Sequence, residues 1–174
     1  MARKVKATPA PKSAVKKLPL WEERAVKKLA SSGLTMEDAK LLGIEVLTAE
    51  QMGAEDSKFH ELCALRFTYH GIDGKPCSDV PGGPVFHRYR YLEDPPDFSA
   101  QTKAPRYVQK PNTLPVAYLP TLIDWVKTAA DANESVIITE GELKAAKACK
   151  EGFATIGLGG VSNWRSKKIG RAHV

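Results

Sequence analysis

The sequence lacks several features that would define its class at once. No apolar run approaches the ~20 residues that a membrane-spanning helix needs. The basic start is not followed by the apolar segment of a secretory signal. The three cysteines, Cys63, Cys77 and Cys149, are odd in number and widely spaced, which argues against a disulfide framework and for a reducing compartment. We therefore expect a cytoplasmic protein with no membrane partner.

Patterns for common cofactors and catalytic centres are also missing or incomplete. There is no Walker lysine motif, and the four histidines complete no convincing Ser/His/Asp order. Gly157-Leu158-Gly159 resembles the start of a dinucleotide fingerprint, but Ser162 stands at its sixth position. The candidate zinc ligands include no C-x2-C pair. They are Cys63, His70, Cys77 and His87. A dinucleotide enzyme and a zinc site therefore remain minor alternatives.

Positive charge is concentrated at the start of the chain. Residues 1–17 hold six basic residues and no acid, which equals the whole net charge of +6. These residues are Arg3, Lys4, Lys6, Lys12, Lys16 and Lys17. Interleaved with Ala and Pro, they predict a disordered tail over residues 1–18. Such a tail adds salt-sensitive affinity for nucleic acid, although it can also be a purely solubilising extension.

The next segment opens with helical patterns. Pro19 precedes a predicted helix from Leu20 to Ala30 with one apolar face. A second helix is expected from Met36 to Leu42, with Thr35 as its cap. Thr48 to Gln51 is a T-x-x-Q capping box for a further helical turn. The pair could form a helix-turn-helix, but neither helix presents a base-reading face.

Two β-rich runs follow, at Glu61–His70 and Val85–Leu92, and predict a hairpin with a long irregular loop. Arg88 and Arg90 share one face of the second run, opposite two tyrosines. Arginines beside aromatic residues on a sheet can follow a nucleic-acid backbone. The alternative is a half-buried strand whose charges lie in water.

Proline residues then limit regular structure as far as residue 120. Short strands fit at Tyr107–Lys110 and Val116–Leu119, and Leu122–Ala132 reads as an amphipathic helix. Trp125 in that helix is predicted to be a core anchor.

The following stretch predicts a β-α-β unit. Val136–Ile138 is a continuous β-branched run, typical of a strand buried on both faces. Glu142–Lys150 favours a helix that stops at Gly152. Phe153–Ile156 is a second apolar run. The short connection predicts two parallel strands.

Glu140 and the glycines give this unit its chemical interest. Ligands of open α/β sheets bind at the carboxyl ends of the strands, where Glu140 lies. A carboxylate there can hold a divalent metal or move a proton, and Gly141 permits close approach. Gly157, Gly159 and Gly160 can cradle a phosphate with backbone N–H groups. The plainer alternative is a Glu that favours the helix dipole, followed by a turn glycine.

At these residues the chain resembles a known family. Thr139–Ala145 and Gly160–Trp164 resemble the T-E-G-E-x-K-A and G-V-x-N-W-like segments of the Toprim-like domain in phage and plasmid replication proteins of the primase or primase-helicase type. The resemblance implies that Glu140 is the general acid/base and that Mg²⁺ is the cofactor. Lys144 stands where many Toprim proteins carry an acid, and it would contact phosphate. No Asp-x-Asp magnesium pair follows Gly160 in this chain.

The sequence therefore predicts an α/β protein: a small α+β lead-in domain over residues 19–120, then the first β-α-β half of a Toprim-like parallel sheet over 121–168. Residues 169–174 read like a translated library adapter and are expected to be non-native, with a natural basic C-terminus as the alternative. The expected function is that of a fragment of a DNA replication protein, primase-like, with DNA, nucleotides and possibly a helicase as partners. The alternative is a non-catalytic module that recruits DNA or a helicase.

Overall fold

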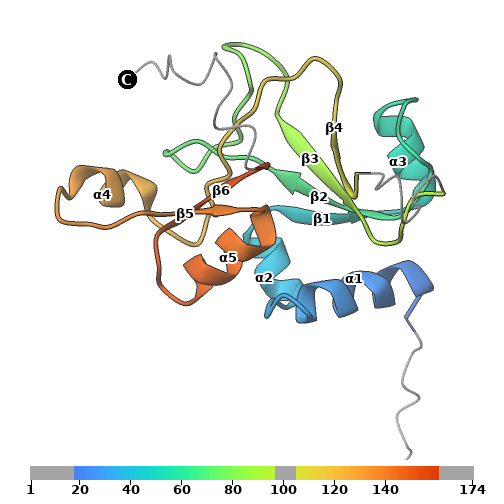
Figure 1. The fold of residues 1–174 in the computed structure, drawn as a ribbon, viewed down its shortest axis with the longest axis horizontal. Coiled ribbons are helices and arrows are strands. Elements are labelled where there is room, and N and C mark those ends of the chain that lie inside the picture. The colour runs from blue at the N-terminus through green and yellow to red at the C-terminus, as the bar shows by residue number, and fades with distance from the viewer. Residues whose placement is uncertain (1–17, 97–104, 161–174) are drawn as a thin grey trace, which may run out of the picture.

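The computed structural model describes residues 18–96 and 105–160, which form two β-sheets and the helices that cover them (Figure 1). In chain order the elements are α1 (Leu20–Ala30), α2 (Met36–Leu41), β1 (Ile44–Leu47), α3 (Ala49–Glu55), β2 (Ala64–Thr68), β3 (His87–Tyr91), β4 (Tyr107–Gln109), α4 (Trp125–Ala130), β5 (Ile137–Glu140), α5 (Glu142–Lys150) and β6 (Thr155–Leu158). The protein is thus mixed α/β, as its sequence predicts. The basic tail, Val161–Trp164 and residues 169–174 lie outside the described residues.

The larger sheet is antiparallel, with strand order β1-β2-β3-β4. The predicted hairpin is confirmed, because β2 pairs with β3 and places Phe67 opposite Arg88. Strand β4 confirms the short strand predicted at Tyr107–Lys110. Strand β1 was not predicted, since four residues give too short an alternation to detect. By contrast, Val116–Leu119 forms only an isolated bridge through Tyr118.

Local capping fixes the two short helices that flank β1. In α2 the backbone N–H of Asp38 donates to Thr35 Oγ1 over 3.1 Å, and the Thr35 N–H donates back to Asp38 Oδ2 over 2.7 Å. Thr48 and Gln51 make the same reciprocal pair at the start of α3, over 3.3 and 2.8 Å. Each box satisfies backbone donors that a helix start otherwise leaves exposed. Both predicted helix starts are therefore confirmed.

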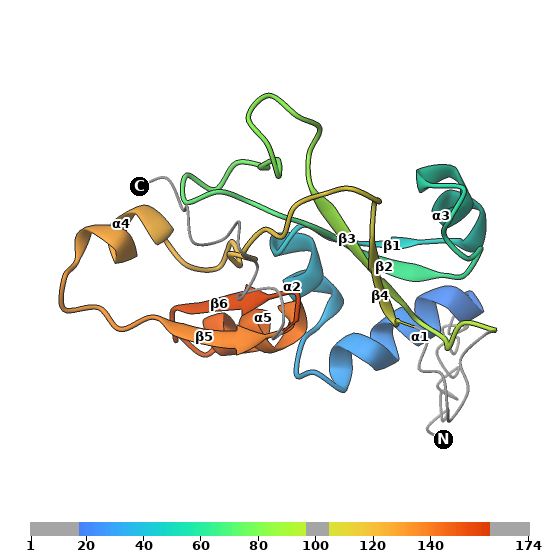
Figure 2. The ribbon, with the colours of Figure 1, turned by 45° about the horizontal axis from the view of Figure 1, so that its top comes forward.

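The antiparallel sheet packs on both faces. One face carries Leu65, Phe67 and Tyr69, which share a core with residues of α1, α2 and α5. The other face carries Tyr89 and Tyr91, which pack with residues around α3. Figures 1 and 2 show α1, α2 and α5 along one side of the sheet and α3 on the opposite side. The arginines of β3 therefore point toward the side of α1 and α5, because Tyr89 and Tyr91 occupy the other face.

The second sheet is the predicted β-α-β unit, and its two strands are parallel. Gly152 has a φ of +91°, which suits the glycine expected after α5. The far edge of β6 is also occupied: Tyr118 and Gly157 exchange two backbone hydrogen bonds of 2.8 and 2.9 Å. Tyr118 packs against Phe67 and Tyr69 of the larger sheet. The two sheets are thereby joined through backbone and core.

Two expectations for this region are wrong in detail. The run at Val136–Ile138 was predicted to be buried on both faces, yet Ile137 and Ile138 are 48% and 66% exposed. The apolar run forms a strand, and among the described residues β6 and α5 are the elements that pack most closely against it. Helix α4 is shorter than the predicted Leu122–Ala132. Its anchor is confirmed, because Trp125 is buried and its indole N–H donates to the Pro120 carbonyl over 2.8 Å.

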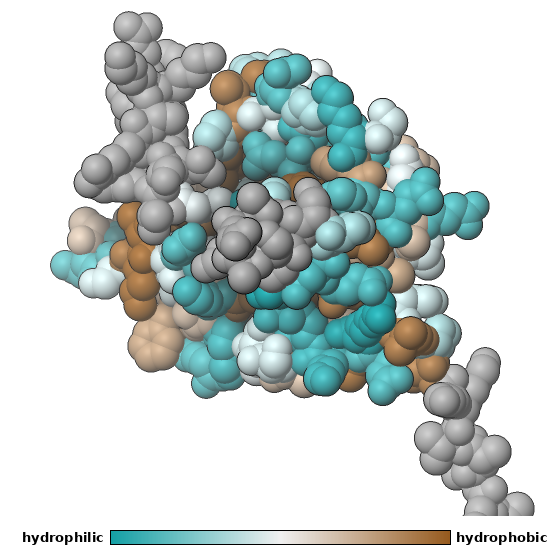
Figure 3. All heavy atoms as spheres, turned by 45° about the vertical axis from the view of Figure 1, so that its right-hand side comes forward, coloured by the Kyte–Doolittle hydropathy of each residue, from teal (hydrophilic) through white to brown (hydrophobic). Residues whose placement is uncertain are grey.

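No helix within residues 18–96 and 105–160 is long and apolar enough to cross a membrane. Hydrophilic residues predominate on the face of the molecule that Figure 3 shows, with hydrophobic residues at separate places between them.

Candidate functional site

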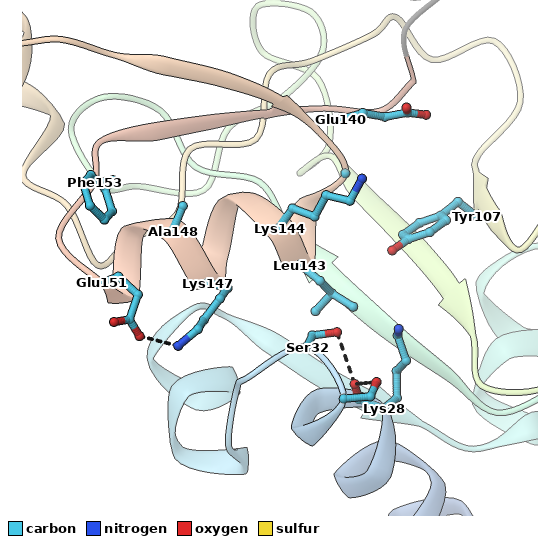
Figure 4. Close-up of a pocket in the computed structure, with 12 residues that line it drawn as sticks. Lys28, Ser32, Tyr107, Glu140, Leu143, Lys144, Lys147, Ala148, Glu151 and Phe153 are labelled. Atoms are coloured by element: carbon cyan, nitrogen blue, oxygen red, sulfur yellow. Dashed lines mark hydrogen bonds and ion pairs between the residues drawn. The ribbon is translucent and has the colours of Figure 1, made fainter.

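Glu140 ends strand β5 and lies at the carboxyl edge of the parallel sheet (Figure 4). Its side chain is exposed, and no hydrogen bond from it to another described residue occurs. Gly141 follows with a φ of +93°, and its N–H donates to the Leu158 carbonyl over 2.9 Å. Nothing lies within 4 Å of the position that a Gly141 Cβ would take. A carboxylate with open space beside the next residue can approach a ligand closely.

The next acid, Glu142, is buried and accepts hydrogen bonds from the larger sheet. Only 1% of its side chain is exposed. The Tyr69 hydroxyl donates to Glu142 Oε1 over 2.6 Å, and Arg88 Nη1 donates to the same oxygen over 2.8 Å. Burial, followed by the neighbouring charge of Glu142, raises the pKa of Tyr69 far above its usual range. The tyrosine is therefore a fixed, neutral donor.

This contact ties the first turn of α5 to strands of the larger sheet. Glu142 is the first residue of α5, whereas Arg88 belongs to β3. Burial alone would lower the pKa of Arg88, but Glu142 and Tyr69 raise it. Arg88 Nε and Glu142 Oε2 have no partner among the described atoms. The pair positions Glu140 indirectly, because only Gly141 separates the two acids.

The hypothesis that Arg88 follows a nucleic-acid backbone is wrong, and so is the alternative that its charge lies in water. Its side chain is 13% exposed and paired with a buried carboxylate. The period of two in β3 gives the correct face for Arg88 and Arg90. It does not reveal that α5 covers that face with an acid. Sequence reasoning missed Glu142 for the same reason, since its partners are 54 and 73 residues away.

Arg90 remains available at the surface of this region. Its guanidinium lies over the ring of Tyr107, 5.6 Å from the centroid, and its Nη1 donates to the Tyr91 carbonyl over 3.0 Å. Arg88 contacts the same ring at 5.1 Å. Burial, with a smaller contribution from Glu142, raises the pKa of Tyr107 to about 12. Tyr107 thus holds both arginines in defined positions and stays protonated.

The predicted phosphate-facing glycines do not act as one loop. Gly157 lies inside β6, and its N–H already donates to Tyr118, so it cannot cradle a phosphate. A Cβ at Gly157 would lie 3.2 Å from both Ala145 Cβ and the Gly141 carbonyl oxygen. Gly159 passes over the guanidinium of Arg88, 2.5 Å from where its Cβ would be. The prediction that Gly157 binds phosphate is therefore wrong. A glycine at this position allows Ala145 and the Gly141 carbonyl to pack closely against β6. Gly160, with a φ of +145°, keeps its predicted role untested.

Replacing Gly157 by Val should therefore lower the free energy of unfolding by about 2 kcal/mol, because the added methyl groups overpack a rigid contact. Urea unfolding followed by circular dichroism measures the loss. Gly71→Val is the control, since its Cβ would meet a single side-chain atom, Asp73 Oδ1, at 3.2 Å and no backbone. Unchanged stability of Gly157→Val would contradict the packing role.

A hollow of about 800 Å³ lies beside Glu140, between α5 and the end of α1. Lys144 and Lys28 reach toward it from the two helices, and Tyr107 faces it from β4 (Figure 4). Lys147 also lines it but forms an ion pair with Glu151. The structure thus brings together Glu140, Gly141 and Lys144, as predicted, and adds Lys28 and Tyr107. Tyr107 lies in a short strand that the sequence predicts, whereas Lys28 carries no motif that a sequence could reveal.

The described residues do not by themselves make a metal centre. No group of three or more His, Cys, Asp or Glu side chains that could hold an ion occurs among residues 18–96 and 105–160. The four candidate zinc ligands are thus not assembled there. Glu140 is a single carboxylate, and a catalytic magnesium ion held by one carboxylate also needs substrate phosphates, so the described residues do not complete such a site on their own. Its magnesium role remains a prediction.

The fold and site thus define a mixed α/β protein with an exposed carboxylate at the carboxyl end of a parallel strand. Residues 124–173 match a family described as "Domain of unknown function (DUF3854)". The match contains the whole β5-α5-β6 unit and extends across most of the segment predicted to be non-native. No curated protein and no solved structure is similar enough to match.

Proposed function

We propose that the protein belongs to a DNA replication system and is primase-like. In this proposal Glu140 is the general acid/base of magnesium-dependent nucleotidyl transfer or phosphodiester chemistry. DNA and nucleotides are its partners, possibly with a replicative helicase. The observation that carries the proposal is the position of Glu140, exposed at the end of β5 beside a hollow that Lys144 and Lys28 line. Lysines beside a carboxylate suit a phosphate-bearing substrate.

The open edge of β5 supports a larger active sheet. Strand β6 is paired on both edges, whereas β5 has only β6 beside it among the described residues. Val136, Ile137 and Ile138 are 43%, 48% and 66% exposed. Parallel sheets are normally covered on both faces, so these exposed apolar side chains favour a further covering element, while the unpaired edge of β5 leaves room for another strand. A third parallel strand on this edge would bring its own carboxyl end next to Glu140, where an Asp-x-Asp pair would complete a magnesium site.

A second function follows from the missing carboxylates. Among the described residues Glu140 has no second acid with which to bind an ion. Without such acids the same surface would only bind. The protein would then be a non-catalytic module that recruits DNA or a helicase. The two functions differ in whether carboxylates from another strand reach Glu140.

The deciding experiment is to sequence the source DNA past the codon of Lys168 and to assay the product of the whole reading frame. We expect a strand that ends in Asp-x-Asp, and magnesium-dependent primer synthesis on single-stranded DNA. The 174-residue chain is the matched control and should be inactive. A whole product that binds DNA but makes no primer under these conditions would refute the enzyme and favour the binding module.

A further inference from the structure

A groove runs past Glu140 and continues along α1 toward the antiparallel sheet. The hollow beside Glu140 adjoins a second one of about 400 Å³, and the two share Lys28 and Ser31 of the α1 region. The second hollow is lined by α1 on one side and by Arg90 and Arg106 on the other. We call the two hollows together the α1 groove. It is open and elongated, because its lining comes from α1, α5, β3 and the segments around β4.

Cations outnumber acids along the α1 groove. Its lining cations are Arg24, Lys27, Lys28, Arg90, Arg106, Lys144 and Lys147. Its lining acids are Glu93, Asp94, Glu140 and Glu151. Three of these acids are already paired, in Arg24–Glu93 at 2.6 Å, Arg106–Asp94 at 2.7 Å and Lys147–Glu151.

Four cations of the groove then lack a carboxylate partner within the part of the chain that the structure describes. They are Lys27, Lys28, Arg90 and Lys144. Only Glu140 remains to balance them. The groove is therefore a strip of excess positive charge that leads to the proposed catalytic acid, and such strips attract anions.

The environment of Lys28 shows that these charges face one another. Partial burial lowers the pKa of Lys28, and the charges of Arg90 and Arg106 lower it further. Like charges held together repel, and an anion between them would relieve that repulsion. The stacking of Arg90 on Tyr107 keeps its guanidinium in place without a carboxylate. The cations are thus arranged before any ligand arrives.

The shape of the groove favours a chain of phosphates over a single anion. The unpaired cations come from three different elements and are spread over both hollows. An exposed aromatic ring, Phe153, which is 59% exposed, lines the far end beside α5. Positively charged grooves with aromatic side chains bind single-stranded nucleic acids through backbone charge and base stacking.

We propose that the α1 groove binds the backbone of a single-stranded nucleic acid, with Lys28, Arg90 and Lys144 as its principal phosphate contacts. The proposal extends the proposed function, because the bound strand would be the one presented to Glu140. Binding needs neither magnesium nor catalysis, so the two proposals can fail separately.

The test uses the full chain and a fluorescein-labelled oligo(dT) of about 16 nucleotides, followed by fluorescence anisotropy in EDTA at several salt concentrations. Lys28→Gln with Lys144→Gln should weaken binding about tenfold at low salt. It should also reduce the slope of log affinity against log salt by about 1.4, because each lost phosphate contact in a single strand contributes about 0.7. The control is Lys40→Gln with Lys58→Gln, two exposed lysines outside the groove, and should stay within about twofold.

Equal losses in the two double variants would overturn the proposal, because only net charge would then matter. Unchanged affinity in the groove variant would overturn it as well. The proposal would also be overturned if the groove variant weakened the binding of a fluorescent nucleoside triphosphate but left the binding of the oligonucleotide unchanged. Groove-dependent binding by a whole product that makes no primer would refute the proposed enzyme and uphold the groove.

Discussion

Replacing Glu140 by Gln in the whole reading-frame product should reduce magnesium-dependent activity by about 10³-fold, the range in which general acid/base groups act. The change keeps the shape of the side chain and removes its proton-transfer capacity and its charge. The fold of the variant should be intact, because the Glu140 side chain is exposed and makes no hydrogen bond to another described residue. Primer synthesis and urea unfolding, measured on the same preparation, separate the two effects.

Glu134→Gln is the matched control, since Glu134 is an exposed acid in the loop that precedes β5. It should change neither activity nor stability. Full activity in Glu140→Gln would refute the acid/base role. Lost activity accompanied by lost stability would assign Glu140 to the fold instead of the chemistry.

Replacing Arg88 by Met should lower the free energy of unfolding by about 3 kcal/mol, because it leaves a buried carboxylate without its cation. Among the described residues, the Tyr69 hydroxyl would then be the side-chain donor that Glu142 keeps. The loss should also loosen the first turn of α5, since Glu142 is its first residue. Urea unfolding measures the stability change.

The exposed pair Arg106–Asp94, with each side chain 49% exposed, supplies the control. Arg106→Met should cost less than about 1 kcal/mol. Adding Glu142→Gln to Arg88→Met should recover part of the loss, because the uncompensated charge is then gone. A cost for Arg88→Met as small as that for Arg106→Met would contradict the buried ion pair.

Sequence patterns predicted the helices and strands well where residues close together in the chain determine them. The capping boxes at Thr35 and Thr48 need only residues three positions apart. The hairpin of β2 and β3 follows from two β-rich runs and the turn material between them. Strand β1 escaped because its pattern is short, and its stability comes from pairing with β2.

The burial and contacts of a residue, in contrast, depend on segments that are distant in the sequence. The apolar run at Val136–Ile138 predicted a strand correctly but its burial wrongly, because burial requires neighbours that the run itself does not specify. The role of Gly157 was wrong for a similar reason. Its glycine is explained by Ala145 and Tyr118, which approach it from other segments. Glu140, Gly141 and Lys144 were predicted as neighbours from sequence because they lie within five consecutive residues.

The two backbone hydrogen bonds between Tyr118 and Gly157 have a mechanical consequence. Together with the Arg88–Glu142 pair and the shared core, they fasten the β-α-β unit to the antiparallel sheet at several points. Domain closure needs a hinge about which two parts of a protein can separate. The β-α-β unit and the antiparallel sheet are held together by too many contacts for such a hinge. Glu140 therefore keeps a fixed position relative to the antiparallel sheet. Among the described residues, access to Glu140 is therefore not expected to be controlled by movement of the β-α-β unit against the antiparallel sheet.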